Sequence, residues 1–271
     1  MKNKQFPNFK NPPVTETVLG VQFDPIEKLS APLYGLYYSK IRNEYSNFEV
    51  HPPLFQTVER FDEQHGVAPP TINLEMRETL DERCWFLENE GNRLLQVQKD
   101  RFIQNWRKAK KDDEYPRYES LKPIFKKEWL RFCDFLNEEK LPAPEVNQCE
   151  VTYINHLEIG KGWQSFGEVD KITKFWSKGS GEFLPVAERV TINLRYQMPE
   201  KLGRLHITLK PVIRTIDMKE LFQVELTARG APSSSSVEDI LKWLDLGREW
   251  VVKGFSDFTT NELHKIWEEG I

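Results

Sequence analysis

The stretch RLHITLKPVIRTI at 204–216, followed by LFQVELTAR at 221–229, decides the fold. Apolar and polar side chains alternate along both, which is the period of a strand with one buried and one open face. A short connection joins them, so we expect an antiparallel pair. The open face is polar and carries several basic residues. The apolar face needs a cover, which amphipathic helices elsewhere in the chain can supply.

Further strands follow from the same pattern. Glu90-Gly91-Asn92 is typical of a tight hairpin turn, and Pro199–Gly203 is typical of a turn that leads into the strand at 204. The other strands predicted in this way are 14–23, 48–61, 71–78, 84–90, 93–106, 149–159 and 183–198.

Apolar residues at helical spacing predict two long helices and several short ones. Ser236 with Asp239 resembles a capping box, and Thr259 with Glu262 predicts a second cap for a short last helix. The helices predicted in this way are 31–46, 117–139, a short one within 160–180, 237–258 and the short last one.

The order of predicted elements repeats along the chain. Residues 1–145 read strand, helix, several antiparallel strands and a long helix. Residues 146–271 read strand, short helix, three strands and a long helix. Two related halves explain this order, and convergent amphipathic patterning explains it equally well. We expect one continuous unit of the α+β class: a large antiparallel β-sheet built from both halves, with long amphipathic helices packed on one face.

The composition is that of a globular protein, with 271 residues of which 30% are charged and 39% hydrophobic. The net charge of −4 argues against a general nucleic-acid binder but leaves a local basic face open. Cys84, Cys133 and Cys149 are odd in number and form no CxxC, so a cytoplasmic location is expected. No apolar run approaches about 20 residues, so no membrane span is expected, and the polar N-terminus lacks a secretion signal.

The opening NPPVTETVLGVQF at 11–23 carries a recognisable motif. It resembles the opening of a sporadically distributed, uncharacterised bacterial protein family. The matching residues are Asn11, Pro12, Pro13, Val14, Glu16, Val18, Gly20, Gln22 and Phe23. LLQVQKDRFIQNWRK at 94–108 and the ending from Phe255 to Trp267 are similar too, so the resemblance spans nearly the whole chain. It implies no activity, cofactor or catalytic residue, and the patchy distribution of the family suggests an accessory role in bacterial defence or on mobile elements.

Motifs for catalysis and metal binding are missing from the sequence. There is no GxSxG elbow, Walker loop, GxGxxG, HExxH or kinase set. Gly160-Lys161-Gly162 reads as an ordinary turn, and the five histidines make neither an i, i+4 pair nor a group with cysteine. We therefore expect no catalytic residue, no cofactor and no metal.

The segment from Gln96 to Arg107 has the most unusual local composition. If 93–106 is a single strand, Gln96, Gln98 and Asp100 share one face, with Leu94 and Phe102 on it too. A polar row flanked by apolar residues can line a cleft for a ligand or partner. A solvated outer face is the plainer alternative. The candidate binding residues are Gln96, Gln98, Arg101, Asn105, Trp106 and Arg107.

The open face of the second half is the other candidate, because it is net basic. Solvation is the default for such a face, and it lacks exposed aromatic residues for base stacking. Asn155 is expected to be buried, either to satisfy a backbone group or to bind a ligand. The candidate residues for a phosphate or an acidic partner are Arg195, Arg204, His206, Lys210, Arg214 and Arg229.

We therefore expect a non-catalytic binding or interaction protein with a protein partner, or a homo-oligomer. Its surface is the polar sheet face together with Gln96 to Arg107. A nucleic-acid-binding protein that uses the basic face is the nearest alternative, and an enzyme with a site assembled from distant residues is the third.

Overall fold

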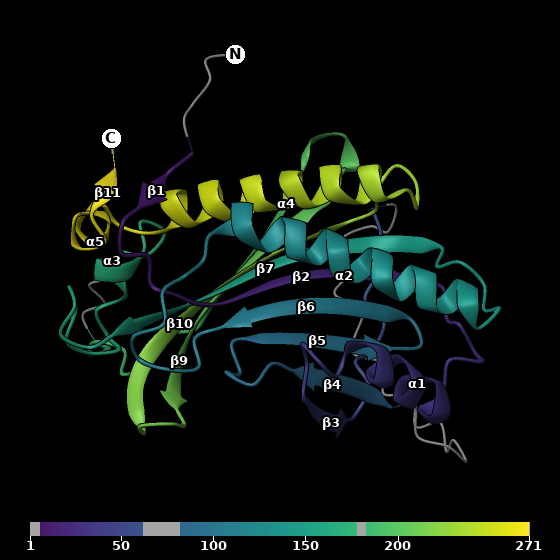
Figure 1. Ribbon diagram of the computed structural model, residues 1–271. Coiled ribbons are helices and arrows are strands. Elements are labelled where there is room, and N and C mark those ends of the chain that lie inside the picture. Colours follow the sequence, from purple (N-terminus) through teal and green to yellow (C-terminus); the bar gives the residue numbers. More distant parts are fainter. Residues whose placement is uncertain (1–5, 62–81, 178–182, 271) are drawn as a thin grey trace.

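One antiparallel sheet of nine strands dominates the computed structural model, which describes residues 6–61, 82–177 and 183–270 (Figure 1). The strand order is β3-β4-β5-β6-β2-β7-β10-β9-β8. A small second sheet pairs β1 (Asn8–Phe9) with β11 (Glu269–Gly270). The predicted α+β class is confirmed. The strands of the large sheet are β2 (Val14–Phe23), β3 (Asn47–His51), β4 (Arg83–Leu87), β5 (Arg93–Gln98), β6 (Arg101–Arg107), β7 (Val146–Glu158), β8 (Ile192–Gln197), β9 (Arg204–Arg214) and β10 (Lys219–Gly230).

The two halves of the chain meet at the centre of this sheet, where β2 pairs antiparallel with β7 and Leu19 lies opposite Val151. In each half the chain leaves the central strand, passes through a helix to the outer edge, and returns strand by strand to the centre. The outer edges are β3 and β8. The element order of the two halves therefore corresponds in space as well as along the sequence.

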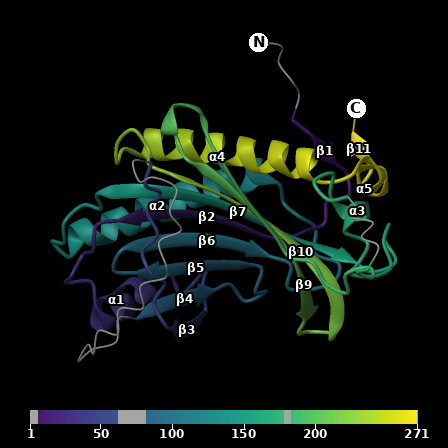
Figure 2. The ribbon, with the colours of Figure 1, turned by 180° about the vertical axis from the view of Figure 1, so that it is seen from behind.

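The long helices α2 (Tyr118–Glu138) and α4 (Val237–Phe258) lie on the same side of the sheet (Figures 1 and 2). α1 (Ala31–Ile41) covers the outer strands of the first half, and α3 (Val169–Ile172) and α5 (Asn261–Ile266) are short. The predicted packing on one face is confirmed, because the apolar stripe of α2 is buried against the sheet. The stripe consists of Tyr118, Leu121, Phe125, Trp129, Phe132 and Leu136.

Aromatic rings join α2 to the sheet. Phe102 of β6 lies 5.5 Å from Trp129 and 5.3 Å from Phe132, measured between ring centroids. Tyr37 of α1 contacts Phe132 at 5.5 Å and Phe86 of β4 at 5.6 Å. Buried aromatic pairs of this kind add specific geometry to a large apolar burial, so they fix how the helices sit on the strands.

Several predicted strands are wrong in extent. The strands predicted at 84–90 and 204–216 end two or three residues early, at Leu87 and Arg214, and three others differ more. The strand predicted at 48–61 ends at His51, because Pro52 and Pro53 have no N–H to donate to a ladder. The strand predicted at 93–106 is two strands, since the chain turns at Lys99-Asp100 and Gln98 pairs with Arg101. In the region 183–198 only β8 is a strand. The strand predicted at 71–78 lies outside the described residues.

Helix boundaries follow local capping. α1 ends at Ile41 instead of residue 46, because the next residues turn into β3. The Ser236 side chain accepts from the Asp239 amide at 3.2 Å, which confirms the predicted cap of α4. The cap predicted at Thr259 is one residue too early. Thr259 Oγ1 donates to the Phe255 carbonyl oxygen at 2.7 Å and so closes the end of α4, while Thr260 begins α5.

Candidate functional site

We call the face of the large sheet opposite α2 and α4 the polar face. Cross-strand neighbours share a face, so the pairing of Gln22 with both Arg101 and Gln148 places all three side chains on it. Gln22, Gln98 and Gln148 are each less than 5% exposed. Polar side chains on the open face of an antiparallel sheet normally meet water. Their burial means that another part of the chain covers them.

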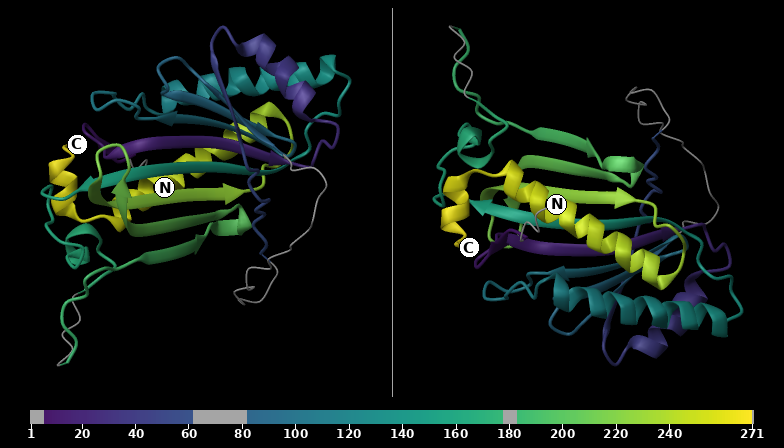
Figure 3. Two further views of the ribbon diagram at one scale, coloured as in Figure 1. Left: turned by 90° about the horizontal axis from the view of Figure 1, so that it is seen from below. Right: turned by 90° about the horizontal axis from the view of Figure 1, so that it is seen from above.

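The cover is the segment 52–61, which we call the strap. Gln98 of β5 bonds to its beginning and Arg204 of β9 to its end. Five strand spacings separate β5 from β9 in the sheet order, which is about 24 Å. The seven residue steps from Leu54 to Phe61 span about 23 Å when extended. The strap is therefore almost fully extended and crosses the strands instead of running along them (Figure 3, left).

Gln98 and Arg101 hold the first part of the strap by its backbone. Gln98 Oε1 accepts from the Leu54 amide at 2.9 Å, and its Nε2 donates to the Leu54 carbonyl oxygen at 2.9 Å. Arg101 Nη2 donates to the Phe55 carbonyl oxygen at 2.9 Å and to Gln22 Oε1 at 2.6 Å. None of these bonds involves a side chain of the strap, so they do not depend on its sequence.

Gln22 and Gln148 hold the middle of the strap in the same way. Gln22 Oε1 accepts from the Thr57 amide at 3.0 Å, and Gln148 Oε1 accepts from the Glu59 amide at 3.0 Å. Gln148 Nε2 also donates to the Thr57 carbonyl oxygen. A primary amide carries a donor and an acceptor side by side, so it matches a peptide group. The glutamines form a ladder of side chains that binds an extended backbone.

Little apolar surface of the strap is buried, and Phe55 is 91% exposed. The strap is held by hydrogen bonds, each worth about 0.5–1.5 kcal/mol net. Detachment would expose glutamine side chains to water and leave the hydrophobic core on the opposite face intact. The contacts of the strap are therefore separate from the hydrophobic core, which lies on the other side of the sheet.

The Glu59 carboxylate points into the polar face, unlike the exposed side chains of Phe55 and Thr57. It accepts from Arg204 Nη1 at 2.6 Å and bonds His206 Nε2 at 2.6 Å, and its side chain is only 7% exposed. Burial acts to raise its pKa, but the hydrogen bonds and charges of His206 and Arg204 outweigh burial and lower the pKa to about 2. Glu59 is therefore an ionised anchor of the strap.

The structure brings four of the residues predicted in the first candidate site together on the polar face. Gln98 and Arg101 contact the strap, whereas Gln96 and Asn105 form a chain of side-chain hydrogen bonds beside it. Arg83 donates to Gln96 at 2.9 Å, Gln96 to Asn105 at 2.8 Å, and Asn105 to a carboxylate oxygen at 2.5 Å. That carboxylate belongs to Glu16 of β2.

Trp106 and Arg107 differ from the other predicted residues. Trp106 is buried on the helix side, where its ring lies 5.5 Å from that of Tyr115, so its assignment to a binding surface is corrected. Phe102 also faces the helices. Because the chain turns at Lys99-Asp100, Gln98 and Arg101 lie on the same face. The even-numbered residues of β6 therefore lie on the opposite face from the even-numbered residues of β5, which a single strand over 93–106 does not predict. Arg107 lies at the end of β6, where its Nε donates to the Gly91 carbonyl oxygen at 2.9 Å.

The six basic residues of the second candidate site all lie on the polar face, since they are in phase along their strands and pair across them. Four of them already have carboxylate partners. Arg204 and His206 bond Glu59, Arg229 donates to Glu150 at 2.6 Å, and Arg214 donates to Glu158 at 2.8 Å. The local charge is therefore more balanced than the sequence indicates, and a phosphate would have to replace carboxylates.

Sequence reasoning missed Gln22, Gln148 and Glu59 as parts of one site. Gln22 lies between Val21 and Phe23, and Gln148 lies just before Cys149, so each is a polar residue in phase within a strand. That signal was present but is shared with any solvated sheet face. Nothing in the sequence showed that residues after Pro53 return across the sheet to these positions.

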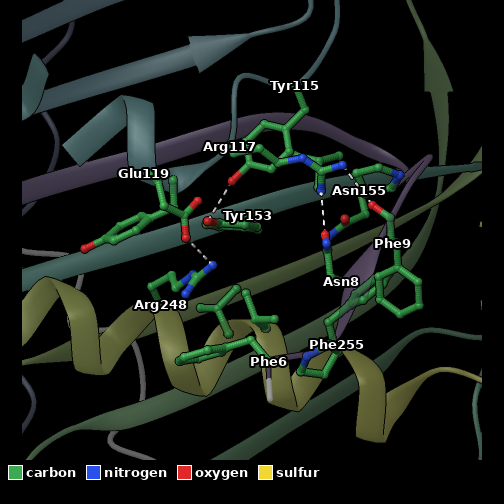
Figure 4. Close-up of a pocket in the computed structure, with 16 residues that line it drawn as sticks. Phe6, Asn8, Phe9, Tyr115, Arg117, Glu119, Tyr153, Asn155, Arg248 and Phe255 are labelled. Atoms are coloured by element: carbon green, nitrogen blue, oxygen red, sulfur yellow. Dashed lines mark hydrogen bonds and ion pairs between the residues drawn. The ribbon is translucent and has the colours of Figure 1, made fainter. Parts of the chain in front are cut away.

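A pocket of about 450 Å³ opens on the helix side, between residues 6–12, α2 and α4 (Figure 4). The Tyr115 hydroxyl donates to the Tyr153 hydroxyl at 2.8 Å, and Arg248 donates to Glu119 at 2.9 Å across its wall. Asn155 lines the pocket, and its Nδ2 donates to the Val224 carbonyl oxygen at 3.1 Å. The expected burial of Asn155 and its use to satisfy a backbone group are confirmed.

Three tyrosines line this pocket beside the ion pair of Glu119 and Arg248. Burial raises the pKa of Tyr115, Tyr118 and Tyr153 above the usual value for tyrosine. A raised pKa keeps a phenol protonated, so these groups donate hydrogen bonds and do not serve as bases at neutral pH. Within the described ranges, no group of three or more metal-ligating side chains comes together. No helix in that part of the chain is long and apolar enough to cross a membrane.

Comparisons with family models, with curated proteins and with solved structures found no match for this chain.

Proposed function

We propose that this protein is a non-catalytic binding protein whose polar face binds an extended segment of another polypeptide. The observation that supports the proposal most directly is the side-chain ladder of Gln98, Gln22 and Gln148, which bonds the backbone of Leu54, Thr57 and Glu59. The strap occupies this surface within the chain, and its contacts support an extended peptide as the kind of ligand. A partner segment takes the place of the strap on the same ladder.

An extended peptide is a better fit to this ladder than a nucleic acid is. Peptide groups offer alternating donors and acceptors, which primary amides match, whereas a phosphodiester offers acceptors only. Nucleic acid is the competing proposal for this face, and the pairing of Arg204, Arg214 and Arg229 with carboxylates weighs against it. An enzyme is the third candidate, and the tyrosines of the helix-side pocket would serve it as hydrogen-bond donors or acids, because their raised pKa excludes a role as bases at neutral pH.

The test uses a chain whose own strap is released. In the double variant Thr57→Pro with Glu59→Pro, two amides that bond Gln22 and Gln148 are absent, and so is the anchoring carboxylate. The probe is a fluorescent peptide with the sequence of residues 52–61, PPLFQTVERF. We expect saturable binding to the released variant. The intact chain should bind far more weakly, because its tethered strap competes at an effective concentration of about millimolar.

Substitutions in the ladder locate the binding. Adding Gln98→Ala and Gln148→Ala to the released variant should abolish peptide binding, whereas Gln164→Ala, at an exposed glutamine, should not change it. Thermal unfolding checks that each variant is folded. No binding to a folded released variant, or equal binding without the ladder, would overturn the proposal. Binding of an oligonucleotide at low salt that is lost on Arg204→Glu with Arg214→Glu would favour the nucleic-acid alternative.

The setting of this activity is also a proposal. A cytoplasmic location agrees with three free cysteines at positions 84, 133 and 149. An accessory role in a bacterial defence or mobile-element system depends on the family resemblance of the opening motif. A homo-oligomer in which copies exchange straps is one form that the protein partner can take, and its signature is a dimer of the intact chain.

A further inference from the structure

Arg204 contacts three consecutive residues of the strap through three different kinds of group. Its Nη1 donates to the Glu59 carboxylate at 2.6 Å, and its Nη2 donates to the Arg60 carbonyl oxygen at 2.7 Å. The guanidinium carbon also lies 4.3 Å from the centroid of the Phe61 ring. The planar guanidinium accommodates all three, since its edge carries the donors and its face stacks on an aromatic ring.

His206 completes the pocket for the carboxylate. Its Nε2 bonds the second Glu59 oxygen at 2.6 Å, so each carboxylate oxygen has its own partner. Arg195 lies opposite His206 on β8, and Arg229 lies opposite Arg204 on β10. Arg229 already has Glu150 as its partner, so Arg204 and His206 are the residues that hold the Glu59 carboxylate. The lowered pKa of Glu59 agrees with these two contacts.

The rest of the strap contrasts with this end. The bonds from the ladder residues to the strap all reach its backbone atoms, and Phe55, Gln56 and Thr57 turn exposed side chains to solvent. Recognition along β5, β2 and β7 is thus indifferent to sequence. Side chains of the strap are contacted at its other end, where it reaches Arg204 and His206 of β9.

We propose that the polar face selects partner segments with an acidic residue followed two positions later by an aromatic residue, bound as Glu59 and Phe61 are. This inference rests on the proposed function, because it assigns the specificity of the same surface. The ladder supplies affinity for an extended backbone, and Arg204 with His206 supplies the choice of partner. The preferred ligand is an extended segment with this acidic residue and this aromatic residue. The side chains at the positions before them do not matter for binding.

The experiment compares three peptides on the released variant Thr57→Pro with Glu59→Pro. They are PPLFQTVERF, the same peptide with Glu59→Gln, and the same peptide with Phe61→Ala. Loss of hydrogen bonds to charged groups should weaken binding of the Glu59→Gln peptide at least about tenfold. Loss of the stacked ring should weaken the Phe61→Ala peptide about two- to fivefold. A Val58→Ala peptide is the matched control and should bind like the parent, since Val58 is 48% exposed.

A double-mutant cycle then assigns the selectivity to the protein residues. In released protein that also carries Arg204→Gln and His206→Gln, the Glu59→Gln peptide should bind as well as the parent peptide. Equal affinity of the parent and Glu59→Gln peptides for the released variant would overturn the selectivity but leave the proposed function standing. Failure of every peptide to bind would overturn both. The peptide series needs no new protein variant, so misfolding of the Arg204→Gln protein does not affect its outcome.

Discussion

The side chain of Gln98 and the backbone of Leu54 meet as two amides, each donating to and accepting from the other at 2.9 Å. Gln98 lies on β5, and Leu54 precedes it by 44 positions in the sequence. A reciprocal pair of this kind fixes the position and direction of the strap at its start, because a single bond would leave the peptide free to rotate. It also explains why a glutamine is buried on an open sheet face.

The first prediction concerns this pair. Gln98→Ala removes both bonds, so the Leu54 amide should exchange its hydrogen about ten- to a hundredfold faster than in the unaltered protein. Hydrogen–deuterium exchange followed by NMR measures the rate. Amides in β10 serve as the internal reference, and Gln164→Ala is the matched control. An unchanged Leu54 rate would show that the strap is not held by Gln98.

Much of the sheet was accessible from the sequence, for a physical reason. Alternation marks a strand wherever one face is buried, as in Leu205, Ile207 and Leu209 of β9, and α2 shows its buried stripe in the same way. Connections were harder. The two-residue turn at Lys99-Asp100 contains no glycine or proline, so 93–106 was predicted as a single strand. Phe102 was therefore placed on the face of Gln96 and Gln98, whereas it faces the helices.

The candidate site was accessible only in part. Gln98, Arg101 and Arg204 were predicted from unusual polarity on strands, and each contacts the strap. Their shared ligand was not predictable, because it depends on a segment that crosses the sheet at a distance in sequence. A strand period describes which side chains share a face, and it contains no information on what covers that face.

A second prediction follows from Glu59. Its pKa in the folded chain is about 2, below the usual 4.5, because the bonds and charges of His206 and Arg204 overcome the opposing effect of burial. A depressed pKa stabilises the docked strap at pH values above 4.5, and that contribution is lost as the pH falls from about 4.5 towards 2. Carbon-detected NMR titration of the carboxyl group should therefore give a midpoint well below 4.5. Amide protection of the strap should decline over the same range, and Glu59→Gln should remove this dependence.

The third prediction tests the aromatic core. Phe132 is fully buried and contacts Phe102 at 5.3 Å and Tyr37 at 5.5 Å, so Phe132→Ala leaves a cavity between α2, β6 and α1. We expect the free energy of unfolding to fall by about 3–5 kcal/mol. Leu130→Ala, in the same helix but with a side chain 39% exposed, should cost less than about 1 kcal/mol. Urea denaturation measures both, and similar losses would contradict the packing of α2 on the sheet.

The fourth prediction concerns the turn between β8 and β9, which packs against the end of β10. A Cβ added at Gly230 would lie 2.2 Å from the Leu202 carbonyl oxygen and 2.8 Å from Gly203 Cα, and neither backbone atom can rotate away. The displaced carbonyl also accepts from Trp243 Nε1 at 2.9 Å, so relief of the clash would break the contact between this turn and α4. Gly230→Ala should therefore destabilise the fold by about 1–3 kcal/mol or more.

Gly35→Ala is its matched control. Gly35 lies within α1 with no atom near the added methyl group, and alanine favours the helix, so stability should rise by about 0.5–1 kcal/mol. Opposite signs for the same chemical change would show that the cost at Gly230 comes from its neighbours and not from the loss of a glycine. Equal urea midpoints for Gly230→Ala and the unaltered chain would mean that the Pro199–Gly203 turn does not rest on β10. The β9 strand that carries Arg204 and His206 would then lack the support that fixes its place beneath the strap.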